Sequence, residues 1–98
     1  MEGSASVATD VLASYAADAA REVEGVAGLV EGRLPRQGAV RISGDEAVVV
    51  ELHVELDWGA PARKVGEEVQ RRVADYLERM AGARPRAVDL VVDEIAAP

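Results

Sequence analysis

The sequence contains no cysteine, and this absence excludes several kinds of chemistry at once. Disulfide bridges, thiolate catalysis and a cysteine-ligated zinc site all need that side chain. The 98 residues contain no run close to the ~20 apolar residues of a membrane-spanning helix, and the N-terminus lacks the basic start and apolar stretch of a signal peptide. We therefore expect a cytoplasmic protein that does not insert into a membrane by itself.

Aromatic residues are also scarce, at 3% of the chain, with no phenylalanine. The apolar fraction of 49% consists mainly of alanine and valine, so we expect a core of small side chains without a large internal cavity. A chain of this length forms one domain. We expect that domain to cover residues 1–98, with residues 1–8 as a flexible N-terminal tail.

The chain has few basic residues: it contains 11, compared with 18 acidic residues, and its net charge is -7. Such a charge repels the phosphates of nucleic acids and anionic lipid head groups at long range. Direct binding to either class of partner is therefore disfavoured.

The spacing of apolar residues predicts two amphipathic helices. The first covers residues 9–24, with Thr9 as its N-cap and Gly25 as the residue that ends it. Residues 26–38 contain three glycines and a proline, which predicts a long connection. The second helix covers residues 61–81 and ends at Gly82. Its apolar stripe consists of Val65, Val69, Val73, Tyr76, Leu77 and Met80.

Three strands are predicted, over residues 39–43, 47–58 and 87–95, and the first two form a hairpin around Gly44-Asp45. In residues 48–56 every second residue is valine or leucine, while most of the others are charged, so one face of the sheet is covered and the other faces water. The predicted order is α-β-β-α-β. We expect an α+β two-layer sandwich with two helices on one face of a three-stranded mixed sheet.

The chain's one histidine stands between two carboxylates on the water-facing side of the second strand, as Glu51, His53 and Glu55. Zinc accepts such ligands, but one histidine among carboxylates is a weak set, and alternating polar residues are typical of any strand face in water. The sequence places no nucleophile or oxyanion donor beside this histidine. We therefore expect no metal site, no cofactor and no enzyme activity.

Two groups of residues are candidates for partner binding. Arg33, Arg36 and Arg41 surround the long connection and would suit an acidic segment of a partner. Val49 and Val91 lie on the otherwise acidic face of the sheet and would favour self-association.

An α/β unit of this size also occurs in RNA-binding domains of the KH type, but the sequence lacks their basic Gly-x-x-Gly loop between two helices. A KH-like RNA-associated module with atypical acidic charge is the alternative hypothesis.

Residues 20–28, Ala-Arg-Glu-Val-Glu-Gly-Val-Ala-Gly, resemble the end of the first helix in the bacterial alkaline shock protein family. This family is also called the envelope stress response or general stress protein family. Three later pieces resemble it in the same order along the chain. Residues 48–56 resemble the family's long central strand, residues 65–73 its second helix, and residues 80–82 with 87–92 its closing turn and strand.

The resemblance implies a small cytoplasmic protein that forms homo-oligomers and has no catalytic residues or cofactor. It also implies a position at the inner face of the cell membrane, where a small integral membrane protein holds it. The expected function is therefore that of a non-enzymatic scaffold or adaptor in cell-envelope homeostasis and stress response.

Overall fold

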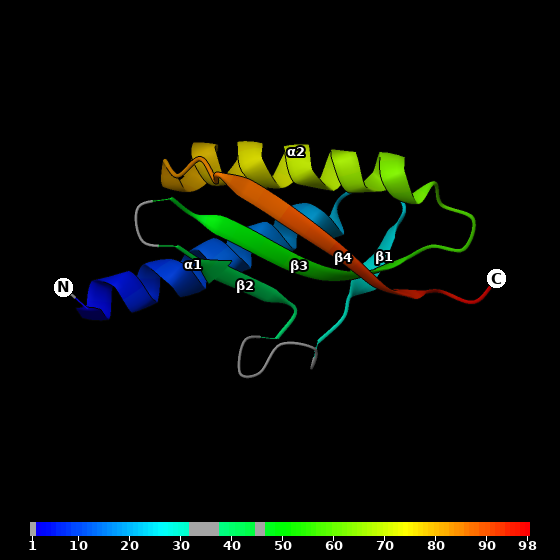
Figure 1. Ribbon diagram of the computed structural model, residues 1–98, viewed down its shortest axis with the longest axis horizontal. Coiled ribbons are helices and arrows are strands. Elements are labelled where there is room, and N and C mark those ends of the chain that lie inside the picture. The colour runs from blue at the N-terminus through cyan, green and yellow to red at the C-terminus, as the bar shows by residue number, and fades with distance from the viewer. Residues whose placement is uncertain (1, 32–37, 45–46) are drawn as a thin grey trace.

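The computed structural model describes the backbone of residues 2–31, 38–44 and 47–98, and within these ranges the side chains from Thr9 onward (Figure 1). The protein is an α+β fold with two helices and a four-stranded sheet. The elements in chain order are α1 (Glu2–Arg21), β1 (Val26–Leu29), β2 (Val40–Ser43), β3 (Val49–Leu56), α2 (Ala62–Ala81) and β4 (Ala87–Ile95). The predicted order α-β-β-α-β and the predicted three-stranded sheet are therefore wrong by one strand, which is β1.

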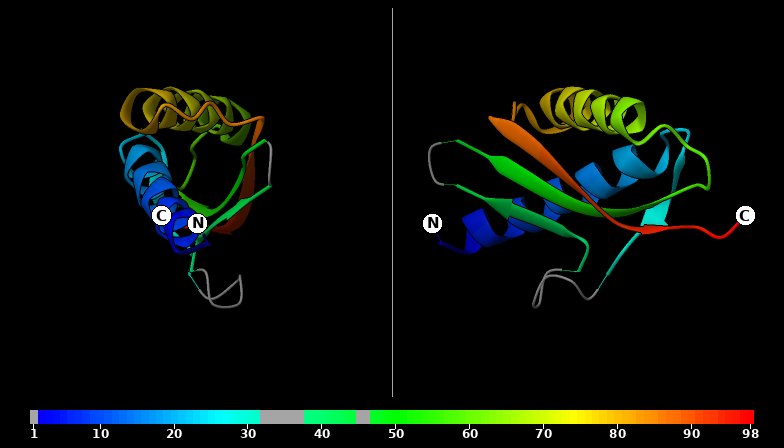
Figure 2. Two further views of the ribbon diagram at one scale, coloured as in Figure 1. Left: turned by 90° about the vertical axis from the view of Figure 1, so that its left-hand side faces the viewer. Right: turned by 45° about the vertical axis from the view of Figure 1, so that its right-hand side comes forward.

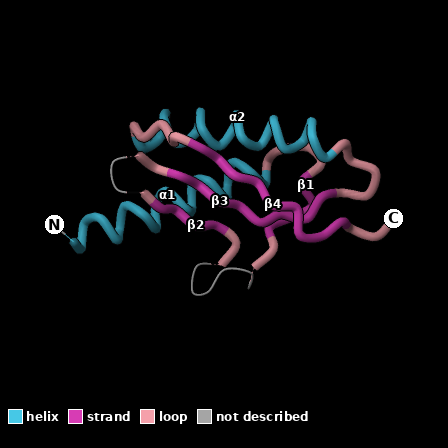
Figure 3. The backbone as a smooth tube through the Cα atoms, in the orientation of Figure 1, coloured by secondary structure: helices cyan, strands magenta, loops and turns pink. Residues whose placement is uncertain are grey.

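Strand β3 is the centre of the sheet (Figure 3). One of its edges pairs with β4 in parallel, and β1 and β2 both pair with it in antiparallel orientation. The pairing of β2 covers the first half of β3, from Val49 to Leu52, whereas β1 pairs with its end, from Val54 to Leu56. The sheet is therefore mixed, and β1 and β2 follow each other along a single edge of β3.

The backbone of His53 marks the junction between β1 and β2. Its carbonyl accepts a hydrogen bond of 2.8 Å from the N–H of Val30, and its own N–H donates one of 2.9 Å to the carbonyl of Ala39. Residues just before and just after the connection thus bind to the same residue. Residues 26–29 belong to the segment that we expected to be a connection because it contains three glycines and a proline, but pairing with β3 satisfies their backbone groups.

Helix α1 begins at Glu2 and ends at Arg21, so both predicted limits need correction. Residues 2–8 belong to the helix instead of forming a flexible tail, Met1 lies outside the described residues, and Thr9 is not the N-cap. After Arg21 the chain makes tight turns, with hydrogen bonds from the N–H groups of Glu22 and Val23 to carbonyls three residues earlier. Gly25, at φ 101°, lies in these turns and leads into β1.

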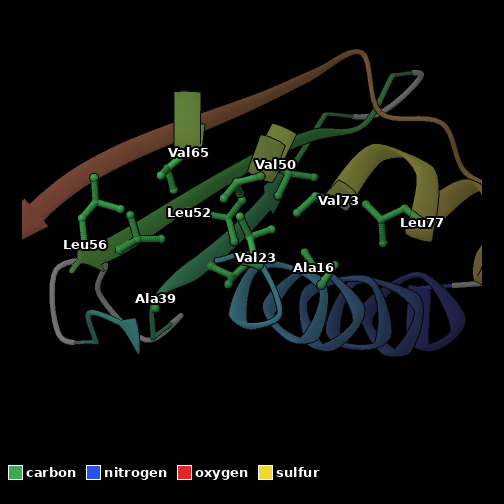
Figure 4. Packing of buried hydrophobic residues seen from close by; sticks show 14 residues of the cluster. Ala16, Val23, Ala39, Val50, Leu52, Leu56, Val65, Val73 and Leu77 are labelled. Atoms are coloured by element: carbon green, nitrogen blue, oxygen red, sulfur yellow. The ribbon is translucent and has the colours of Figure 1, made fainter. Parts of the chain in front are cut away.

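One buried cluster lies between the sheet and the two helices (Figure 4). Strand β3 contributes Val50, Leu52, Val54 and Leu56, each no more than 1% exposed, so its predicted alternation is confirmed. Helix α1 contributes mostly alanines, which let the helix backbone approach the sheet closely. Both helices therefore cover the same face, as the two rotated views also show (Figure 2).

Helix α2 agrees closely with its prediction. It follows Pro61 and ends at Gly82, whose φ of 67° is left-handed and whose N–H donates to the carbonyl of Glu78 over 2.9 Å. The buried stripe consists of Val65, Val69, Val73 and Leu77. Tyr76 is only half-buried, and Met80, which we assigned to the stripe, is 47% exposed.

Candidate functional site

A network of charged side chains crosses the outer face of the sheet, opposite the helices. His53 on β3 contacts Glu51 of the same strand, with 2.7 Å between Nε2 and Oε2. Its other ring nitrogen, Nδ1, lies 2.5 Å from Oδ2 of Asp93 on β4. Glu51 in turn forms an ion pair with Arg41 on β2. These four residues, Arg41, Glu51, His53 and Asp93, are called the His53 cluster below, and they link three strands.

The strand registers bring the four side chains together. Arg41 pairs directly with Glu51 across β2 and β3, so their side chains point to the same face. On β4 the register shifts after the pair Val54 and Val92, and Asp93 is the additional residue. The residue that pairs with Glu55 is therefore Glu94, and Asp93 has no partner residue on β3 in the ladder. Its side chain lies on the outer face, where it contacts His53.

Electrostatics favour the charged form of the cluster. Burial of His53 opposes the imidazolium, but hydrogen bonds to Glu51 and Asp93 and the charges of both carboxylates outweigh it, so the pKa of His53 is raised above its ordinary value. The hydrogen bond from His53, helped by Arg41 and opposed by burial, lowers the pKa of Glu51. The two carboxylates therefore stabilise the imidazolium form of His53 relative to the neutral ring.

The contacts of His53 are not those of a metal ligand. Glu51, His53 and Glu55 were the candidate ligand set in the sequence. Both ring nitrogens of His53 are occupied by carboxylates, whereas a metal ligand needs a free nitrogen lone pair. Glu55 takes no part in the network. Across residues 2–31, 38–44 and 47–98 no group of three histidine, cysteine or acidic side chains is placed to hold a metal ion.

The candidate partner-binding residues lie in different places. Arg33 and Arg36 fall outside the described residues, and Arg41 belongs to the His53 cluster. Val49 and Val91 both lie on the outer face and are half-buried. Val91 pairs with His53, four residues along β3 from Val49, so about 13 Å of strand separates the two valines. They do not form a continuous apolar patch.

The turn after α1, the loop between β3 and α2 and the first turns of α2 meet at one end of the molecule (Figure 1). An open pocket of about 720 Å³ is lined by residues of these three segments. Trp58, the chain's only tryptophan, lines it and is 64% exposed. The pocket, called the Trp58 pocket below, is lined by Glu22, Val23, Glu24, Gly25, Asp57, Trp58, Gly59, Ala60, Pro61, Lys64, Val65, Glu68 and Arg72.

No role for Trp58 was predicted from the sequence. The available signal was that the only tryptophan stands between Asp57 and Gly59, at the end of the predicted strand over residues 47–58. In the structure Gly59 has φ 79°, and the N–H of Ala60 donates to the carbonyl of Asp57 over 3.1 Å. Trp58 lies at the surface in this turn, whereas Ala60, two residues later, packs against the buried cluster.

Neither α1 nor α2, the two helices in the described part of the chain, is long and apolar enough to cross a membrane. Comparison of the chain with protein-family models, with curated proteins and with solved structures finds no match.

Proposed function

We propose that the protein is a non-enzymatic scaffold or adaptor in bacterial cell-envelope homeostasis and stress response. It acts by self-association and by binding a small integral membrane protein, which holds it at the cytoplasmic face of the cell membrane. The observation that carries the proposal is the order of the four segments that resemble the alkaline shock protein family, from residues 20–28 to residues 87–92.

Exposed apolar side chains at one end of the fold support a role in protein binding. Ile95 is 61% exposed at the end of β4, where it pairs with Leu56, and Trp58 follows Leu56 by two residues. Large exposed apolar side chains that lie close together are typical of protein interfaces. An adaptor needs such surfaces, whereas a cavity closed around a substrate is not required.

The test is the location of the protein in cells and the dependence of that location on a partner. A tagged chain is expected in the membrane fraction and is expected to co-purify from detergent extracts with one small integral membrane protein. Deletion of the gene for that protein should move the chain to the soluble fraction. A chain that stays soluble in wild-type cells under envelope stress contradicts the proposal.

The RNA alternative has a separate outcome. Nucleic acid that co-purifies at low salt and is released steeply by added salt would favour a KH-like module, because phosphate contacts depend strongly on ionic strength.

A further inference from the structure

We propose that the Trp58 pocket binds a peptide segment of a protein partner that carries arginine or lysine beside apolar residues. The inference rests on the proposed adaptor function, since it names the chemistry of the segment that the adaptor holds. The pocket volume of about 720 Å³ lies within the ~300–1,000 Å³ range of ordinary binding sites.

The exposure of Trp58 is the first observation. A chain with so few aromatic residues leaves its largest side chain 64% exposed, while its buried cluster is made of alanine, valine and leucine. The turn from Asp57 to Ala60 is closed by a hydrogen bond, so the position of Trp58 is determined by the backbone. Tryptophan is enriched among the residues that contribute most to interfaces, because it buries a large area at a low cost in conformational entropy.

The charge of the lining is the second observation. Four carboxylates line the pocket, against the two cations Lys64 and Arg72. Glu22 lies 3.9 Å from Arg72, and Glu68 pairs at 2.6 Å with Arg71 on the same helix.

The other two carboxylates, Glu24 and Asp57, form no ion pair with the residues that the structure describes. Both line the same pocket as the exposed Trp58, so a basic side chain in this pocket has carboxylates and an aromatic ring available as partners. Tryptophan is the best aromatic partner for a cation, and carboxylates bind guanidinium and ammonium groups through charge-assisted hydrogen bonds.

Apolar side chains complete the lining and point to a long basic side chain. Val23, Ala60, Pro61 and Val65 lie among the charged residues of the pocket. Arginine and lysine carry an aliphatic stem that packs on such surface while the charged end reaches a carboxylate. An acidic peptide or a phosphate group would instead meet the excess of carboxylates.

The probe for the test is a C-terminally amidated peptide, Gly-Ala-Arg-Leu-Arg-Ala-Gly, labelled with fluorescein on its N-terminal amine and followed by anisotropy at low salt. We expect wild-type protein to bind it and expect weaker binding as salt rises. Trp58→Ala should weaken binding about tenfold. Trp58→Phe should restore part of the affinity, and Asp57→Asn should weaken binding by a smaller factor. Asp10→Asn, which removes the same charge from an exposed position on α1, should leave the affinity unchanged.

Trp58 is exposed, so its variants are expected to fold, and circular dichroism checks this. The proposal is overturned if the peptide does not bind wild-type protein, if Trp58→Ala binds it equally well, or if peptides with glutamine or glutamate in place of arginine bind as tightly. Concentration-dependent self-association that Trp58→Ala abolishes, without peptide binding, would assign the pocket to a second copy of the chain.

The two proposals fail separately. If the peptide binds in a way that depends on Trp58 but the chain never reaches the membrane, the adaptor proposal is wrong and the proposed binding site in the Trp58 pocket stands. If the chain is held at the membrane but Trp58→Ala does not change its partner binding, the proposed site in the Trp58 pocket is wrong and the adaptor proposal stands.

Discussion

Asp93 Oδ2 lies 2.5 Å from Nδ1 of His53, although 40 residues separate the two in the chain. The contact joins β4 to the central strand on the face away from the helices. Because Glu51 occupies the other ring nitrogen, the imidazole ring is held on both sides. The His53 cluster thus links β2, β3 and β4 on this face through side-chain contacts.

The His53 cluster predicts a stability that depends on pH. The pKa of His53 is raised in the folded state, so its contribution is fully present below the unfolded pKa of about 6.5 and is lost as the pH rises through the folded pKa. The pKa of Glu51 is lowered, so its contribution is present above its unfolded pKa and is lost as the pH falls through the folded one. We expect His53→Gln to destabilise the protein more at about pH 6 than at about pH 9.

Thermal unfolding of wild type and His53→Gln between about pH 6 and about pH 9 measures the difference in their stability. Asp93→Asn should reduce stability by about 1–2 kcal/mol near pH 6, because it replaces a charge-assisted hydrogen bond to His53 with a neutral one. Asp10→Asn on α1 serves as the control for loss of one negative charge. A gap between wild type and His53→Gln that is constant from about pH 6 to about pH 9 would contradict the assignment.

Gly25 is expected to tolerate alanine poorly for two reasons. Its φ is 101°, and an added Cβ would lie 2.6 Å from Cγ2 of Val65 on α2. Gly82 has a positive φ of 67° but open space around it, and Gly28 has open space without a positive φ. We expect substitution by alanine to lower the free energy of unfolding by about 2–4 kcal/mol at Gly25, by about 1–2 kcal/mol at Gly82 and by less than about 0.5 kcal/mol at Gly28. Urea unfolding of the three variants measures this order, and equal losses at Gly25 and Gly82 would show that the contact with Val65 is unimportant.

Tyr15 and Tyr76 join the two helices through an edge-to-face contact, with ring centroids 5.7 Å apart and planes at 88°. We expect a double-mutant cycle with Tyr15→Leu and Tyr76→Leu to give a coupling free energy of about 0.5–1.5 kcal/mol. A zero result in the cycle would mean that the ring contact adds nothing to the burial of each side chain.

Leu77 and Met80 test the boundary of the core on α2. Leu77 is fully buried and Met80 is 47% exposed, although both fit the apolar pattern of the helix. Leu77→Ala should lower the free energy of unfolding by about 2–5 kcal/mol, and Met80→Ala by less than about 0.5. Denaturant unfolding compares them, and similar losses would argue that the end of α2 packs differently.

The elements that the sequence predicted well are those with strong local signals. The second helix has Pro61 before it, Gly82 after it and a regular apolar stripe between them. The long central strand buries every second residue from Val50 to Leu56, with His53 also buried on its other face, and β4 has the predicted limits. Where local signals conflict with the fold, the prediction failed. Thr9 suggested an N-cap, but the helix continues back to Glu2, and Gly28 suggested a connection, but β3 supplies pairing partners.

The candidate site was predicted in part. Alternation placed Glu51 and His53 on the water-facing side of one strand, and that follows from period-two geometry alone. It also placed Glu55 with them, but the network contains Asp93 of the neighbouring strand β4 instead, whose Oδ2 lies 2.5 Å from Nδ1 of His53. No local pattern indicates which strand lies beside β3 or where its register shifts.

The sequence by itself determined the two helical faces, the buried side of β3 and the small side chains of the core, since these depend on spacing within one segment. Only the tertiary structure decided that β1 and β2 share an edge, that Asp93 reaches His53, and that Trp58 borders a pocket with Glu24 and Asp57. Each of these contacts joins residues far apart in the chain, and their relative position depends on how whole elements pack.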